Sequence, residues 1–232
     1  MGEHTAFFYG RQSPNVCKTQ YAYHFAGTLM APPVLHRVIY GTTTPEEWQS
    51  KLTTVRPALL QGYQRHKVKH ADYPGILPHS ATSSSETGSS VPSVRGSLVT
   101  GLTDGDIWRL DIFEGDQYTR QKVRVKVLKD TALDALADEA NLAAHVEDEV
   151  EAETYVWTDP RNHLEEEEWD FEEFKREKMW AWVGQASEEN GVEVDSGFGD
   201  VDRAVRDEQQ SDPTGGRGAG GKIIKELEAD AV

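Results

Sequence analysis

The sequence predicts an α+β fold, because segments with helical spacing alternate with segments of strand-like alternation. The most informative stretch starts at Thr103, a typical helix N-cap residue, and apolar residues then recur at three-residue spacing over Ile107–Phe113. Gly115 offers the left-handed conformation that commonly ends a helix. Valine then alternates with basic residues over Val123–Val127, which is typical of a half-buried strand.

The remaining elements follow from the same two spacings and from proline placement. Pro32 and Pro33 fit the first turn of a helix, where a missing N–H costs little. Aromatic residues after Trp169 project mainly onto one broad helical face and are expected to pack in a core. We expect strands at about 5–10, 58–61, 64–68, 94–99 and 152–157. We expect helices at about 32–38, 45–48, 132–144 and from about 169 onward.

Length and composition predict one domain with a polar tail. The 232 residues allow one domain of about 150–180 residues plus a tail, or at most two small domains. Residues 81–90 have no apolar content, so a flexible surface loop is expected at about 80–93. Residues 185–232 are polar and glycine-rich and are expected to be disordered. The last few apolar residues of this tail suit a short helix on a partner, but the sequence does not indicate which partner.

Charge is distributed unevenly and excludes some partners. Residues 1–132 carry a net charge of +4 and residues 133–232 carry −20. Binding to a phosphate backbone depends on clustered Lys and Arg, so no nucleic-acid partner is expected. The basic run Arg65–His70 is short and alternating, which favours a solvated strand face. His66 and His70 are interpreted as surface histidines, because no nearby Cys or Glu completes a zinc site.

The sequence predicts a soluble, cytoplasmic protein. No apolar run approaches 18 residues, so neither a transmembrane helix nor a membrane partner is expected. The N-terminus has neither the basic start nor the apolar core of a signal peptide. Cys17 is the single cysteine, which excludes an intrachain disulfide and a paired-cysteine metal or redox site.

Glu114 is the candidate catalytic residue. It sits at the expected C-terminal end of a helix, beside apolar Ile112 and Phe113. The helix dipole and the apolar neighbours both disfavour the ionised carboxylate, so its pKa is expected to rise toward the range of a general base. The competing interpretation is an ordinary, partly exposed glutamate at a helix end.

Six short motifs occur in a distinctive order. They are Phe7-Phe8-Tyr9-Gly10, Thr28-Leu29-Met30, Asp72-Tyr73-Pro74-Gly75-Ile76, Val94-Arg95-Gly96-Ser97-Leu98, Leu110-Asp111-Ile112-Phe113-Glu114 with Tyr118-Thr119-Arg120, and Thr154-Tyr155-Val156-Trp157. In this order they resemble the γ-glutamylcyclotransferase-like superfamily, particularly its fungal and plant branch of avirulence-induced-gene-like proteins. The resemblance covers about residues 5–184. It implies a small mixed β-barrel with flanking helices over that range.

One segment departs from the family pattern. The family motif runs Tyr-Gly-Thr-Leu without a break, whereas residues 11–27 separate Tyr9-Gly10 from Thr28-Leu29 here. We interpret this segment as a retained, in-frame intron, because codons for Gly10-Arg11 and Ala26-Gly27 can supply the GT donor and the AG acceptor. The alternative is a real insertion that remodels the substrate loop. Sequencing the transcript decides between them.

The resemblance also implies an activity and a set of site residues. A γ-glutamyl substrate would cyclise to 5-oxoproline and release its amine, with Glu114 as the acid–base residue and no cofactor or metal. Tyr9, Gly10, Thr28 and Leu29 would form the substrate-binding turn. Tyr118 and Arg120 would orient Glu114 or contact substrate, although Arg120 fits a solvated strand face equally well. Two alternatives stay open: a non-catalytic binding protein on the same fold, and transfer of the glutamyl group to another amine.

Overall fold

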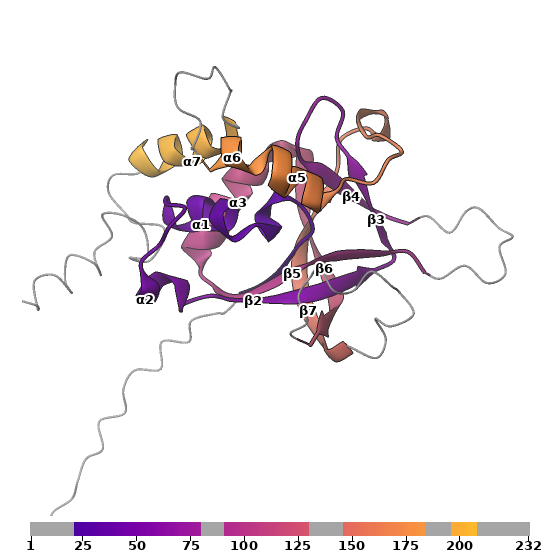
Figure 1. The fold of residues 1–232 in the computed structure, drawn as a ribbon, viewed down its shortest axis with the longest axis horizontal. Helices are drawn as coiled ribbons and strands as arrows, with labels where there is room; N and C mark the ends of the chain where they lie inside the picture. Colours follow the sequence, from indigo (N-terminus) through magenta and orange to yellow (C-terminus); the bar gives the residue numbers. More distant parts are fainter. Residues whose placement is uncertain (1–20, 80–90, 130–145, 184–195, 208–232) are drawn as a thin grey trace, which may run out of the picture.

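The computed structural model describes residues 21–79, 91–129, 146–183 and 196–207, and five of its strands form a closed barrel (Figure 1). Neighbouring strands pair in the order β1-β5-β2-β6-β7, and the closing β1–β7 pair is the parallel one. The predicted α+β fold on a small mixed barrel is therefore confirmed. The barrel strands are β1 (Tyr21–Phe25), β2 (Thr54–Gln61), β5 (Ser93–Leu102), β6 (Tyr118–Leu128) and β7 (Val146–Trp157).

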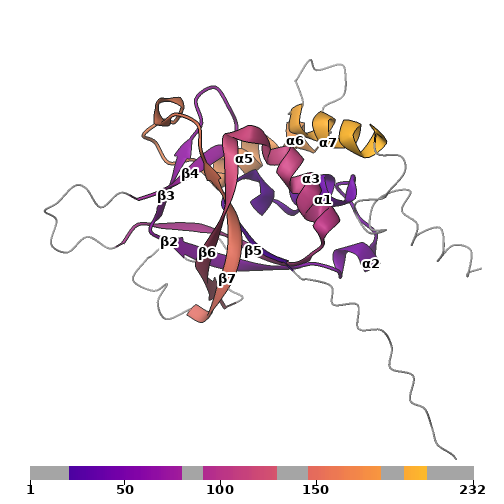
Figure 2. The same ribbon diagram turned by 180° about the vertical axis from the view of Figure 1, so that it is seen from behind.

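Helices pack together beside the barrel, as Figures 1 and 2 show for α1, α3, α6 and α7. A separate hairpin of β3 (Tyr63–Lys67) and β4 (Pro74–Pro78) lies against the barrel. The α-helices are α1 (Pro32–Tyr40), α2 (Glu47–Ser50), α3 (Asp104–Glu114), α5 (Phe171–Glu177), α6 (Met179–Trp182) and α7 (Ser196–Asp207). Single-turn 3₁₀ helices are η1 (Thr28–Met30), η2 (Gly115–Gln117) and η4 (Arg161–His163).

The start and the end of α3 are set by local chemistry, as the sequence predicts. The Thr103 hydroxyl accepts from the Asp106 N–H, and the Asp106 carboxylate accepts from the Thr103 N–H at 2.7 Å, which makes a reciprocal cap. At the other end Gly115 has φ +66°, a conformation that L side chains rarely adopt. The chain then enters β6 at Tyr118. Glu114 is thereby fixed between a helix and a barrel strand.

Two apolar cores share strand β1. Tyr23 and Phe25 belong to the core between the barrel and the helices, whereas Ala22 and Ala26 pack inside the barrel. Successive strand residues face opposite sides, so one strand serves both cores. The barrel interior is filled by Ala58, Leu60, Ile76, Val94, Leu98, Val123, Val125, Val127, Ala152 and Val156.

The position of the first barrel strand corrects the sequence analysis. The strand expected at 5–10 lies outside the described residues, and β1 comes from residues 21–25, within the segment interpreted as an insertion. Residues 21–27 are therefore not extra chain in this structure: they pair with β5 and lead into η1. The reason is that aromatic residues at 21, 23 and 25 bury against the helices while small residues face the barrel interior. The structure does not bear on the transcript, so the retained intron stays a prediction.

A second correction concerns the tail. Disorder was expected for the whole of residues 185–232, and this does not hold for residues 196–207, which form α7. Phe198 and Val201 are buried at 3% and 1% exposure, and the Phe198 ring lies 5.0 Å from that of Phe113. Arg37 on α1 forms a bidentate ion pair with Asp202. These contacts bury enough apolar surface to dock the helix, which the polar composition of the tail concealed.

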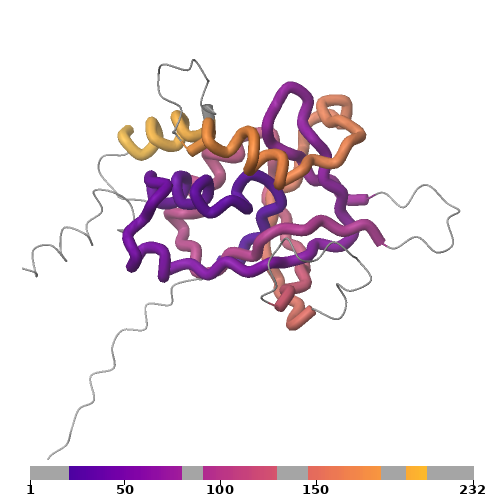
Figure 3. Tube along the Cα trace, in the orientation of Figure 1, coloured from indigo at the N-terminus to yellow at the C-terminus, as the bar shows by residue number. Residues whose placement is uncertain are grey.

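The basic run is also less solvated than expected, because a second layer covers it. Val68 bridges to Leu164, and the backbone of Lys67 bonds to those of Glu165 and Glu167, so this later segment lies along the β3–β4 hairpin (Figure 3). Arg65 and His66 are consequently buried rather than exposed. The helix expected at 132–144 lies outside the described residues, as do residues 80–90 of the loop expected at about 80–93. Ser93 already belongs to β5.

Candidate functional site

A cavity of about 270 Å³ opens where α3 ends, beside the corner that follows β1. Glu114 lies on its wall, together with Gly27, Thr28 and Leu29 of the corner. β4 contributes Pro74 and Ile76, while α6 and α7 complete the rim with Trp182, Gly197 and Asp200. The other lining residues are His24, Phe25, Ala26, Tyr73, Ile112, Phe113, Gly115, Gln117, Tyr118, Thr154 and Tyr155.

The corner after β1 is a compact set of backbone donors. The N–H groups of Met30 and Ala31 donate to the carbonyls of Gly27 and Thr28, both at 3.0 Å, which closes the single turn of η1. The N–H groups at the start of such a turn have no partner inside it. Within the described part of the chain, Gly27, Thr28 and Leu29 donate no backbone hydrogen bond in this region. Outward-facing N–H groups of this kind favour a carboxylate or an oxyanion.

Gly27 is required at the corner by space and not by backbone conformation. Its φ is −129°, which any residue adopts. A Cβ added there would lie 3.0 Å from Cγ of Pro74, closer than nine in ten real contacts. The absence of a side chain therefore lets β4 approach the corner and close this side of the cavity.

Glu114 shares α3 with a polar cluster on the outer side of the barrel. The Tyr155 hydroxyl donates to Asp111 at 2.9 Å, and Nε of Arg120 lies 3.3 Å from the same carboxylate oxygen. Burial first, and then the charges of Glu114 and Asp111, raise the pKa of the Tyr155 phenol. Tyr155 is therefore a neutral hydroxyl on the cavity wall, in the electrostatic range of Glu114.

Tyr118 and Arg120 differ in how they relate to the cavity. Tyr118 lines it and donates from its hydroxyl to the Pro74 carbonyl at 2.9 Å, which ties β6 to β4. Arg120 is not among the cavity-lining residues; it donates to the Tyr23 hydroxyl and pairs with Asp111 and Glu153. Of the two roles considered for Arg120, direct substrate contact is thus not supported by its position. Its pairing with Asp111 holds the helix that carries Glu114.

His24 is an unusual member of the inner wall. It is fully buried, and neither ring nitrogen makes a hydrogen bond within the described residues. Burial and, secondarily, the charge of Arg65 lower the pKa of His24 to about 4, while the Ala58 backbone opposes the shift to a smaller extent. Gly96 provides its space, because a Cβ there would lie 2.5 Å from Nε2 of His24. The imidazole is therefore neutral and poorly compensated in an apolar barrel.

The structure brings Thr28, Leu29, Tyr118 and Glu114 together, whereas Tyr9 and Gly10 lie outside the described residues. Ala26-Gly27 occupies the place before Thr28 that Tyr9-Gly10 was expected to fill. Sequence reasoning missed this corner, although aromatic residues at every second position over Tyr21–Phe25 were a usable strand signal.

The contribution of α7 to the rim of the cavity was also missed from the sequence. The spacing of Phe198, Val201 and Val205 gives an amphipathic stripe within a polar segment. Tyr155 was recognised only as part of a strand motif, and its place on the cavity wall depends on the pairing of β7 with β6.

Comparison with known proteins shows the family of this chain. A model of the family described as "Gamma-glutamyl cyclotransferase, AIG2-like" matches residues 23–171, which include the corner, β4, α3 and β7. The chain belongs to the AIG2-like gamma-glutamyl cyclotransferase family. The match starts inside β1, so it includes the Gly27 corner and excludes residues 5–10.

Similar curated proteins of this AIG2-like family come from Arabidopsis thaliana. The chain is 34% identical to Protein AIG2 C over 122 residues, covering 51% of this chain and 56% of that protein. It is 36% identical to Protein AIG2 B over 123 residues, covering 53% and 57%. The matched part therefore spans little more than half the length of these relatives.

A search of solved structures matched a protein of Arabidopsis thaliana whose structure was determined in solution. The identity is 28%, the TM-score is 0.41, and the match covers 75% of this chain and 91% of that one. A structure titled gamma-glutamyl cyclotransferase has 12% identity and a TM-score of 0.38, and the match covers 63% of this chain and 69% of that one.

No helix in the described ranges is long and apolar enough to cross a membrane.

Proposed function

We propose that this AIG2-like protein cyclises γ-glutamyl amines or γ-glutamyl amino acids to 5-oxoproline and releases the amine. The observation that supports the proposal is that Glu114 and the Gly27–Leu29 corner border one cavity. A carboxylate and a set of backbone donors are the two groups that this reaction needs. The family membership supports the same reaction class.

The substrate supplies its own nucleophile in this reaction. Its α-amino nitrogen forms a bond to its own γ-carbonyl carbon, and the bond from that carbon to the leaving amine breaks. Because both groups belong to one molecule, orientation alone can contribute about 7–11 kcal/mol toward the barrier. The cavity must hold the glutamyl chain folded, and its apolar walls from Ile76, Ile112 and Phe113 suit that purpose.

Glu114 handles the proton. The α-ammonium group loses one proton to water before attack, which leaves a neutral amine as the nucleophile. As the ring closes, the attacking nitrogen loses a second proton to Glu114, which returns it to the nitrogen of the leaving amine, so that a neutral amine departs. A positioned acid–base group typically contributes about 10²–10⁴-fold. The N–H groups of the corner stabilise the negative charge of the substrate, either on its α-carboxylate or on the oxygen of the tetrahedral intermediate.

A comparison of two carboxamide variants tests the proposal. Glu114→Gln removes the acid–base group, whereas Asp116→Asn alters an exposed carboxylate that follows two residues later and does not line the cavity. Release of 5-oxoproline from a panel of γ-glutamyl amines is followed by mass spectrometry. We expect Glu114→Gln to lose about 10²-fold or more with an unchanged fold, and Asp116→Asn to stay active.

The products distinguish the alternatives. Turnover by Glu114→Gln at the rate of the unaltered protein would refute the role of Glu114. A γ-glutamyl adduct of an added amine, without 5-oxoproline, would indicate intermolecular transfer. Saturable binding without either product would indicate a binding protein on the same fold.

A further inference from the structure

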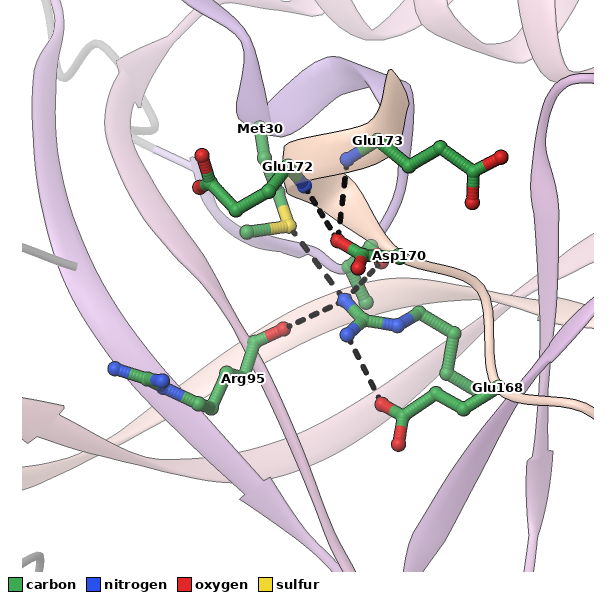
Figure 4. A network of polar contacts seen from close by, with 8 residues as sticks. Met30, Arg95, Glu168, Asp170, Glu172 and Glu173 are labelled. Atoms are coloured by element: carbon green, nitrogen blue, oxygen red, sulfur yellow. Dashed lines mark hydrogen bonds and ion pairs between the residues drawn. The ribbon is translucent and has the colours of Figure 1, made fainter. Parts of the chain in front are cut away.

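Arg65 on β3 is a buried cation directly behind the substrate-binding corner. Its side chain is 10% exposed, and its Nη1 atom donates to the carbonyls of Ala26 at 3.1 Å and Arg95 at 3.3 Å. Its Nη2 atom pairs with Glu168 at 3.0 Å. Figure 4 shows Arg95, Glu168 and the Met30 sulfur converging on this guanidinium. The Trp169 ring, 5.5 Å away, covers one face.

The bond to Ala26 matters because of what lies at the other end of that peptide. The Ala26 carbonyl and the Gly27 N–H belong to one planar peptide group, and every described peptide bond is trans. The N–H therefore points away from the carbonyl and from Arg65. A cation that bonds the carbonyl oxygen withdraws electron density, so the N–H becomes a stronger donor. Ala26 and Gly27 both line the cavity that contains Glu114.

Arg65 has both charged and neutral partners. Glu168 and, at longer range, Asp170 favour its charged form, although the Glu168 side chain is 67% exposed, so water screens this ion pair on one side. Burying a guanidinium carries a desolvation cost that good hydrogen bonds must offset. Burial lowers the pKa of Arg65 below its ordinary value, but a guanidinium stays protonated in proteins at neutral pH. Of the two residues whose carbonyls accept from Arg65, Ala26 and not Arg95 also lines the cavity.

We propose that Arg65 is a positioning residue: through the Ala26–Gly27 peptide it orients and strengthens the Gly27 N–H, which receives the α-carboxylate of the substrate. This inference rests on the proposed function and assigns the corner to the carboxylate rather than to the oxyanion. Arg65 itself does not touch the substrate. Its effect is specific to the negative charge of the ligand.

The test compares two ligands that differ only in that charge. The ligands are γ-glutamylethylamide and its α-carboxamide counterpart, and their dissociation constants are measured by calorimetry. Glu114→Gln serves as the background, which prevents turnover during the measurement. We expect this background protein to prefer the carboxylate, and the added change Arg65→Met to reduce the preference on the order of tenfold.

A matched control and a conservative variant separate positioning from general damage. Glu168→Gln removes the ion pair of Arg65 but keeps its bond to Ala26, so the preference should stay within about twofold. Arg65→Lys keeps the charge and loses the forked geometry that reaches two carbonyls, so an intermediate preference is expected. If Arg65→Met does not fold, the preference of Arg65→Lys for the carboxylate ligand tests the proposal instead. Thermal unfolding of each variant reports its fold.

The outcomes are distinct from those of the activity test. Equal losses for both ligands in the folded Arg65 variants would mean a structural role only, and would overturn the inference. So would an unchanged preference, or a background protein that does not discriminate between the ligands. Formation of 5-oxoproline by the unaltered protein is measured separately, so the reaction can be established while the role of Arg65 is rejected.

Discussion

The Tyr155 hydroxyl donates a 2.9 Å hydrogen bond to Asp111, which precedes Glu114 by one helical turn on α3. A barrel strand is thus joined to the end of the helix that presents the proposed acid–base group. Arg120 lies against the same carboxylate at 3.3 Å, so Asp111 has contacts from both β6 and β7. The position of Glu114 depends on these outer contacts as well as on the helix cap.

Removing the Tyr155 hydroxyl should alter stability more than chemistry. In Tyr155→Phe, Asp111 keeps Arg120 and can bind water, since its side chain is 40% exposed. We expect a loss of about 1 kcal/mol in the free energy of unfolding and less than tenfold in kcat, because Glu114 itself is unchanged. Urea unfolding measures the free energy of unfolding, and the rate of 5-oxoproline release measures kcat. A loss in kcat as large as that of Glu114→Gln would make Tyr155 part of the chemistry.

Alkaline titration checks the environment of the same phenol. The pKa of Tyr155 is raised mainly by burial, and the pKa of Tyr23 is raised for the same first reason. Their folded pKa values lie above the unfolded value near 10, so their stabilisation is complete below about pH 10 and is lost as the pH rises further. Absorbance at 295 nm should show that some tyrosines of the folded protein ionise only well above pH 10. The number of these tyrosines should be lower by one in Tyr155→Phe. Ionisation of every tyrosine near pH 10 in the folded protein would contradict this.

His24 should make the protein sensitive to acid. Its pKa is lowered to about 4, below the unfolded value of 6.5, so the unfolded chain binds the proton first as the pH falls. Stability is therefore full above about pH 6.5 and decreases down to about pH 4, by up to about 3 kcal/mol. Urea midpoints of the unaltered protein and of His24→Leu across this range measure the difference. Parallel curves for the two proteins would show that His24 is compensated in the fold.

Deleting residues 11–27 tests whether residues 4–10 can replace residues 21–27. Counting back from the corner, the deletion puts Phe7 at the place of His24 and Ala6 at the place of Tyr23. A phenyl ring in place of the buried imidazole removes a desolvation cost of about 1–3 kcal/mol, but loss of the fully buried Tyr23 side chain costs about 3–5 kcal/mol. We therefore expect a lower Tm, with release of 5-oxoproline retained. Failure of the shortened protein to fold would show that residues 21–27 cannot be replaced by residues 4–10.

Anchoring of α7 should depend on Phe198. Its ring packs against Phe113 at 5.0 Å and Trp182 at 6.0 Å, so Phe198→Ala should cost about 3–5 kcal/mol of local docking energy and open the rim at Asp200. Hydrogen exchange of the α7 amides measures the loss of docking. The KM for a γ-glutamyl amine measures the effect of the opened rim on substrate binding. Asp202→Asn is the control: its pair with Arg37 is partly exposed and should contribute at most about 1 kcal/mol. Equal exchange rates in the two variants would contradict the assignment of Phe198 as the anchor.

Elements set by local sequence were the predictable part of this fold. The Thr103 cap, the Gly115 end of α3 and the valine alternation of β6 all lie within a few residues of the feature they determine. Local signals alone therefore suffice to place Glu114 at a helix end. Its place on a cavity wall depends on how distant segments pack around it.

Features that depend on distant chain were not predictable in the same way. The alternating charges around Arg65 indicate a solvated strand unless one knows that the segment at 164–169 covers it. The choice of β1 depends on pairing with β5, about 75 residues later. The motif at Tyr9-Gly10 lies outside the described residues, so the structure does not test its predicted role. The tail composition hid α7, because the few apolar residues that dock it, Phe198 and Val201, are set among polar and charged ones.

The cavity wall is assembled from both ends of the described chain, since Gly27 faces residues as late as Asp200. Native contacts so far apart in sequence form slowly, because loop closure must precede them. During synthesis, the barrel can pair most of its strands before the last wall segment leaves the ribosome. Competence to bind a ligand should therefore appear only at the end of folding, well after most of the hydrogen-bonded sheet is in place.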